Sequence, residues 1–128
     1  MKSYILVMTG GAVGAALRYQ LSRMVPASAG GWPWATFAAN VAGGLAMGVL
    51  AAWLLRQGEA GAAGEPVRLL LGVGLLGGFT TFSAFSLEMA QMVERGQGGL
   101  AAGYAVASVL LALAALFVGL TLGRAVLA

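Results

Sequence analysis

The stretch "GGFTTFSAFS", residues 77 to 86, decides how the rest of this sequence is interpreted. It lies inside a segment that is otherwise apolar and long enough to cross a bilayer as a helix. Two glycines come first, and hydroxyl side chains are then interleaved with the rings of Phe79, Phe82 and Phe85. Unwound backbone at membrane depth is tolerated only where it lines a cavity or is buried in protein. The stretch therefore predicts a membrane helix that is interrupted at a functional site.

Composition identifies the chain as an integral membrane protein. Of its 128 residues, 60% are apolar and only 9% are charged, whereas a soluble domain carries about 25% charged residues. The net charge is +3, but the basic residues are scattered singly, so lipid headgroups suffice as partners and nucleic acid is not expected. Cysteine, histidine and aspartate are absent, which leaves little for thiol, transition-metal or acid–base chemistry. We do not expect an enzyme.

Four segments are long and apolar enough to span a bilayer, which takes about 20 residues. They cover residues 4–24, 34–55, 67–93 and 100–122. The first also resembles a signal peptide, with one lysine ahead of an apolar run. Because that run continues to Met24, we interpret it as a span. The connections are short, so the sequence predicts one all-α, four-helix transmembrane domain over residues 1–128.

The basic residues are divided almost evenly between the two sides of the predicted bundle. The side of the termini carries Lys2, Arg56, Arg68 and Arg124, and the other side carries Arg18, Arg23 and Arg95. The positive-inside asymmetry that normally orients a membrane protein is therefore nearly absent. Two explanations stay open: a single orientation set by one extra charge, or insertion in both orientations and assembly as an antiparallel homodimer. Because four helices barely enclose a pathway, transport would favour an oligomer.

Pairs of glycines four residues apart recur along the chain and predict close helix packing. Such pairs let two helix backbones approach each other. The five pairs are Gly10/Gly14, Gly44/Gly48, Gly74/Gly78, Gly99/Gly103 and Gly119/Gly123.

Each predicted helix carries one polar residue near the same membrane surface. Arg18, Asn40, Glu88 and Tyr104 lie four to six residues from their helix ends, or about 6–9 Å deep at 1.5 Å per residue. This arrangement predicts a wet vestibule. Simpler roles stay open for three of them. Arg18 would snorkel to the headgroups, Glu88 would be a structural partner for Arg18 or for helix ends, and Tyr104 would belong to the interfacial aromatic belt. The carboxamide of Asn40 cannot snorkel, which favours a functional role.

The interruption itself is predicted at Gly77–Gly78, near the middle of the third span, because glycine accepts backbone angles that other residues resist. The alternative is a continuous helix whose hydroxyls bond to their own turn. In a broken helix, freed carbonyls face cations and freed N–H groups face anions. Phe82 and Phe85 would share one face. That face is either plain packing or a set of ring edges, whose partial positive charge attracts a small anion.

Three stretches together resemble the Fluc (CrcB) family of bacterial fluoride channels. They are "GGFTTFSAFSLE" from residue 77, "GGAVGAALRY" from residue 10 and "WPWATFAANVAGG" from residue 32, and the likeness extends over nearly the whole chain. The resemblance implies a passive channel that exports fluoride across the bacterial inner (plasma) membrane. It also implies an antiparallel, dual-topology homodimer with two fluoride pores and a central structural sodium ion.

The resemblance also implies roles for individual residues. The backbone carbonyls of Gly77 and Thr80 would hold the sodium ion. Phe82 and Phe85 would form the ring-edge fluoride sites, and Asn40 would orient them and donate to fluoride. The polar path and the electropositive vestibule would use Ser83, Tyr104, Ser108 and Arg18. Where the family commonly has small hydroxyl residues, this chain has Ala84 and Ala112, so its polar path is thinner.

Two other functions compete with the channel. A proton-coupled small multidrug transporter is also a four-helix, often dual-topology protein, but it needs a carboxylate in its first helix. Residues 4–24 contain none, and only Glu88 stands in for it. An assembly or accessory membrane protein would leave Asn40 and the midplane hydroxyls unexplained.

Overall fold

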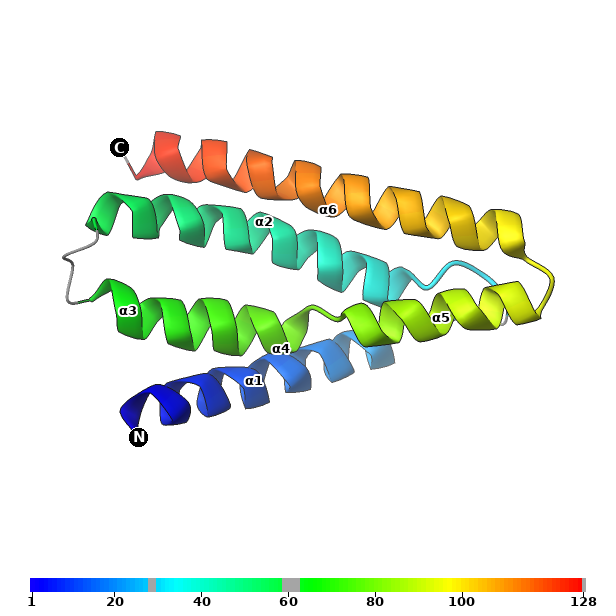
Figure 1. Ribbon diagram of the computed structural model, residues 1–128, viewed down its shortest axis with the longest axis horizontal. Coiled ribbons are helices and arrows are strands. Elements are labelled where there is room, and N and C mark those ends of the chain that lie inside the picture. Colours follow the sequence, from blue (N-terminus) through cyan, green and yellow to red (C-terminus); the bar gives the residue numbers. More distant parts are fainter. Residues whose placement is uncertain (28–29, 59–62, 128) are drawn as a thin grey trace.

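The computed structural model describes residues 1–27, 30–58 and 63–127, and this part of the chain is helical with short connections (Figure 1). The first two long helices are α1 (Lys2–Met24) and α2 (Trp34–Gln57), and the last is α6 (Gly98–Val126). The third long segment is divided into α3 (Gly64–Val67), η1 (Arg68–Leu76), α4 (Gly77–Phe79) and α5 (Phe82–Glu94). Both termini lie at the same end of the molecule.

Three of these segments are long and apolar enough to cross a membrane, judged by length and composition over the described residues: Trp34–Gln57, Gly64–Glu94 and Gly98–Val126. They match the predicted spans 34–55, 67–93 and 100–122, each slightly extended. α1 covers the predicted span 4–24 with 23 residues, but its basic and polar residues make it less apolar. The chain is thus a multi-pass membrane protein, and the fourth span stays a prediction.

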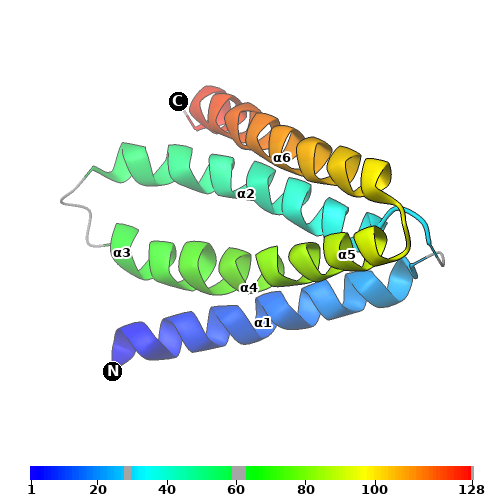
Figure 2. The ribbon, with the colours of Figure 1, turned by 45° about the vertical axis from the view of Figure 1, so that its right-hand side comes forward.

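The helical segments lie side by side in the order α6, α2, α3–α5 and α1 (Figures 1 and 2). α2 packs chiefly on α6, and α1 packs on η1 and α4. Beyond the break the third segment also contacts α6, through α5. Phe85, Met92, Ala101 and Tyr104 form a small core between α5 and α6.

Four of the five glycine pairs lie in close helix contacts, as the sequence predicts. Along the α2–α6 contact, a Cβ on Gly44 would stand 2.6 Å from the carbonyl oxygen of Ala112. Along the α1–α4 contact, a Cβ on Gly78 would stand 2.6 Å from the carbonyl oxygen of Gly11. Only glycine fits where a neighbouring backbone is this close. The pairs concerned are Gly10/Gly14, Gly44/Gly48, Gly74/Gly78 and Gly119/Gly123.

The fifth pair, Gly99/Gly103, does not take part in close packing within the chain. A Cβ at either position would meet no atom of the described chain within 4 Å. The predicted close contact of this pair is not met within the chain, because the start of α6 stands away from its neighbours at that face.

The third segment breaks at Thr80–Thr81, where the backbone is extended (φ −78°, ψ 157° and φ −152°, ψ 125°). The predicted position, Gly77–Gly78, is wrong because both glycines are helical. Gly78 serves the contact with α1 instead. The hydroxyl of Thr81 accepts a bond from the Ala84 N–H (3.2 Å) and so caps the start of α5. A threonine N-cap stabilises a helix start by about 1 kcal/mol. Before the break, η1 is wound as a π-helix.

Candidate ion pathway

Asn40 of α2 is joined to the break by two hydrogen bonds. Its Nδ2 donates to the Thr81 carbonyl oxygen (3.1 Å), and its Oδ1 accepts from the Thr81 N–H (2.8 Å). A carboxamide has two N–H donors, so one remains for a further partner. The sequence predicts Asn40 at the level of Glu88, but it binds the break. Thr36, one turn earlier on α2, occupies the position next to Glu88.

The break changes the hydrogen bonding of two backbone carbonyls. In a continuous helix, the Gly77 carbonyl would accept from the Thr81 N–H and the Thr80 carbonyl from the Ala84 N–H. Here those N–H groups donate to Asn40 Oδ1 and to Thr81 Oγ1 instead. The carbonyl oxygens of Gly77 and Thr80 thus lose their helical donors. Oxygen atoms of this kind are ligands for hard cations.

Phe82 and Phe85 lie together at the start of α5, with ring centroids 5.6 Å apart and planes inclined by 44°. Their surroundings differ greatly. Phe85 is buried, and its ring centroid lies 5.0 Å from that of Tyr104. Phe82 is 78% exposed, so packing within the chain does not explain it.

A groove of about 360 Å³ brings the break, α2, α5 and α6 together. Asn40, Thr80 and Thr81 line it beside Phe82, Phe85 and Ser108; the remaining lining residues are Gly43, Gly44, Met47, Val109, Ala112 and Leu116. None of them is charged. The groove is therefore a mainly apolar passage with a few hydrogen-bonding groups.

The buried hydroxyl of Ser108 is an unsatisfied hydrogen-bonding group in this groove. It is 5% exposed, and its Oγ has no hydrogen-bond partner among the described residues. Leaving a buried hydroxyl unpaired costs about 1–3 kcal/mol. Such a group is suited to donate to an anion in the groove. One turn further along α6, Ala112 lines the groove without a hydroxyl.

Glu88 lies next to the groove in a hydrogen-bonded cluster. Its Oε1 accepts from Thr36 Oγ1 (2.6 Å), and its Oε2 accepts from the hydroxyl of Tyr104 (2.7 Å). Among the described residues no ion pair joins Glu88 to Arg18, so the structural role proposed for that pair is not supported. The aromatic-belt alternative for Tyr104 is wrong, because Tyr104 is fully buried.

Three of the residues expected along the path do not line this groove. Tyr104 contacts the ring of Phe85 and binds Glu88. Ser83 is exposed, with its Oγ 3.5 Å from Thr81 Oγ1. Arg18 is half-buried on α1, and its Nε is buried without a partner among the described residues.

A model of the family described as "CrcB-like protein, Camphor Resistance (CrcB)" matches residues 5–120. The chain belongs to the CrcB-like family. It is 54% identical to a fluoride-specific ion channel FluC of Novosphingobium aromaticivorans, over 98% of this chain and 99% of the relative. It is 55% identical to a protein of the same name from Phenylobacterium zucineum and 50% identical to one from Caulobacter vibrioides, each over the whole length of both chains.

Two residues of this CrcB-like chain have structural roles that the sequence did not reveal. Thr81 both caps α5 and binds Asn40, and Thr36 completes the Glu88 cluster. A threonine just before a run of helix-favouring residues is a signal for an N-cap. Thr36 gives no such signal, since its partner is 52 residues away in the sequence.

Proposed function

We propose that this protein is a passive, fluoride-selective channel that lets fluoride leave the cell down its gradient. The observation that carries the proposal is the groove at the break. There the buried Ser108 hydroxyl, which has no partner among the described residues, lies beside Asn40 and the Phe82–Phe85 pair, and none of the described lining residues is charged. The similarity to proteins named fluoride-specific ion channels supports the same function.

The groove residues replace water around the ion without trapping it. The Ser108 hydroxyl and the remaining Asn40 N–H donate hydrogen bonds, and the phenyl ring edges add a weak positive potential. A lysine or arginine would hold an anion too tightly, because conduction needs binding that is weak enough to release the ion. Chloride is larger, so admitting it would require opening close-packed walls.

We propose further that the working unit is an antiparallel homodimer with two pores. The groove is open on one side, and Phe82 stands exposed beside it. A second copy in the opposite orientation would cover both and place the two breaks together. The near balance of basic residues on the two sides supports insertion both ways up.

A structural sodium ion fits the same arrangement. The carbonyls of Gly77 and Thr80, which have lost their helical donors, would hold it together with those of a second copy. A sodium ion supplies a positive charge that balances several carbonyl dipoles, and here it would fix the two breaks to each other.

The three expected path residues that do not line the groove would lie along the vestibule that leads to it. Arg18 would make the vestibule electropositive, and the exposed hydroxyl of Ser83 would donate along it. Tyr104, which is fully buried, would contribute to the path by holding Glu88 beside it. The protein would lie in the bacterial inner membrane, where fluoride leaves the cytoplasm.

Growth of a bacterium that lacks its own fluoride exporter tests this function. Expression of the wild-type chain should restore growth in fluoride-containing medium, and Phe82→Ile should not. Phe117→Ile is the matched control, because Phe117 is an exposed ring on α6 that does not line the groove. Failure of the wild type to protect, at normal membrane expression, would contradict the proposal.

A further inference from the structure

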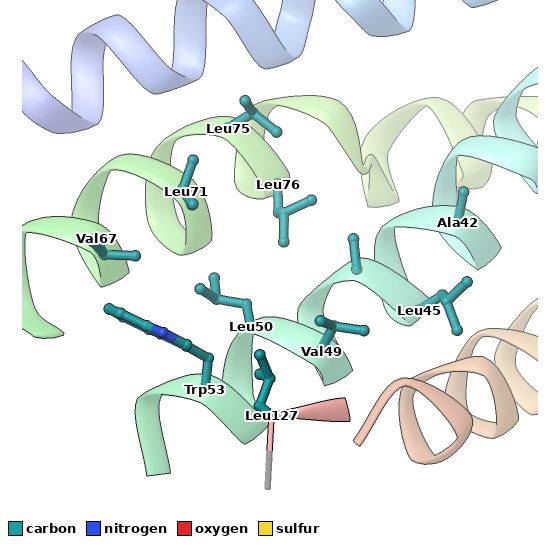
Figure 3. A pocket seen from close by; sticks show the side chains of 11 residues that line it. Ala42, Leu45, Val49, Leu50, Trp53, Val67, Leu71, Leu75, Leu76 and Leu127 are labelled. Carbon is teal, nitrogen blue, oxygen red and sulfur yellow. The ribbon is translucent and has the colours of Figure 1, made fainter. Parts of the chain in front are cut away.

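A second groove, of about 720 Å³, lies between α2 and η1 and has only apolar lining residues. Figure 3 shows Leu50 and Leu76 pointing into it from opposite walls, with Trp53 at one end and Ala42 at the other. This second groove lies on the other side of α2 from the groove at the break. Ala42 and Ala46 line the second groove, whereas Asn40 and Gly44 line the groove at the break. Each alanine follows its counterpart by two residues and therefore points about 200° away from it around the helix.

The length of this groove matches one leaflet of a bilayer. From Ala42 to Trp53 it extends about 16 Å along α2 at 1.5 Å per residue, and half of the hydrocarbon core measures about 15 Å. The Ala42 end is level with the break, because the neighbouring Gly43 contacts Thr80. The Trp53 end is near the end of α2 at Gln57. The groove therefore runs from the midplane to one membrane surface.

The outer end of the groove carries donors for an anion. Arg56 follows Trp53 by three residues, so the two are neighbours on the helix surface. Trp53 has one indole N–H donor. Arg68 at the same end already donates to both oxygens of Glu65, at 2.9 Å each. Arg56 has no such side-chain bond within the part of the chain that the structure describes.

We propose that this groove, named the leaflet groove, binds one acyl chain of an anionic phospholipid, with the lipid phosphate at Arg56. The apolar walls match the acyl chain in chemistry and in length. The positive charge at the outer end matches the phosphate, which arginine binds well in a partly dehydrated setting. A lipid chain here would support Leu76, whose carbonyl accepts two bonds from Thr80 at the edge of the break.

Fluorescence quenching tests this proposal in full-length protein reconstituted in liposomes. Trp32→Phe and Trp34→Phe leave Trp53 as the only tryptophan, since the chain has three. The liposomes are phosphatidylcholine with a minor fraction of one brominated lipid, either phosphatidylglycerol or phosphatidylcholine, with bromine near the glycerol end. We expect the quenching by brominated phosphatidylglycerol to correspond to a local fraction of this lipid at Trp53 about fivefold above its bulk fraction. An enrichment of about this size is what the attraction of an anionic lipid to one basic group near the surface produces.

Four variants separate a lipid site from general contact with lipid. Arg56→Gln should remove the enrichment and Arg56→Lys should keep most of it, whereas Arg124→Gln should leave it unchanged. Ala46→Phe, at an exposed lining residue, should fill the leaflet groove and should also abolish the enrichment of phosphatidylglycerol. Equal quenching by the two brominated lipids in the parent protein would overturn the proposal. So would absence of quenching by either, which would show that a second copy of the chain covers the groove.

Discussion

Asn40 and Thr81 exchange two hydrogen bonds, at 3.1 Å and 2.8 Å, across the contact between α2 and the interrupted third segment. These bonds satisfy the backbone of Thr81 where the helix ladder is lost. They also fix the Asn40 carboxamide in the groove that holds Phe82, Phe85 and Ser108. One side chain thus stabilises the break and orients a donor toward the proposed ion path.

Asn40→Asp should reduce fluoride flux by at least tenfold. The substitution removes both N–H donors and adds negative charge beside the path, and a hydrogen bond to a charged group is worth about 1.5–3 kcal/mol. Fluoride-electrode recordings from liposomes with matched protein content measure the effect. Flux at the wild-type level in Asn40→Asp would show that Asn40 has no role in conduction.

Ser108→Ala should separate a functional hydroxyl from a structural one. Because the Ser108 hydroxyl is buried and unpartnered among the described residues, its removal should leave the melting temperature unchanged or raise it. Fluoride flux should fall about tenfold if the hydroxyl donates to the ion. Thr121→Ala, on the same helix but bonded to the Phe117 carbonyl, should leave flux intact. A large loss of stability with unchanged flux in Ser108→Ala would mean that the hydroxyl is structural.

Gly48→Ala should destabilise the α2–α6 contact by about 1–3 kcal/mol, the cost of overpacking a close-packed site. A Cβ there would stand 2.8 Å from the Leu120 nitrogen and closer still to the Leu116 carbonyl oxygen, and neither backbone atom can move aside cheaply. Gly103→Ala is the control: it meets open space and should stabilise α6 by about 0.5–1 kcal/mol. Thermal unfolding in detergent measures both. Equal effects of the two substitutions on the melting temperature would show that the α2–α6 contact is not close-packed.

Glu88→Gln should leave fluoride flux within a few-fold of wild type. Glutamine can still accept from Thr36 or Tyr104, the two donors to Glu88, and the channel needs no proton exchange at this position. A proton-coupled drug transporter would lose its activity in the same variant. Parallel assays of fluoride efflux and of proton-driven cation uptake therefore distinguish the two functions.

The sequence predicted the long helices, because hydropathy and segment length suffice for these. The family resemblance also grouped Asn40, Phe82, Phe85 and Ser108, and all four line one groove. Their roles toward an ion stay a prediction. The position of the break could not be predicted from the sequence, because glycine at 77 and 78 indicates only backbone freedom. The packing of Gly78 on α1 and the N-cap at Thr81 decide where the helix breaks.

The partners of Glu88 were also beyond prediction from the sequence. Tyr104 and Thr36 reach it from two other helices, and only the packing of α2, α5 and α6 brings them together. The π-helical winding of η1 has no local signal either, since its residues Arg68–Leu76 read as an ordinary apolar helix.

The decisive measurement is fluoride efflux from liposomes that contain the purified protein. We expect rapid loss of fluoride without loss of chloride, and a strong reduction in Phe82→Ile but not in Phe117→Ile. No fluoride efflux above that of protein-free liposomes, from folded and correctly assembled protein, would contradict it.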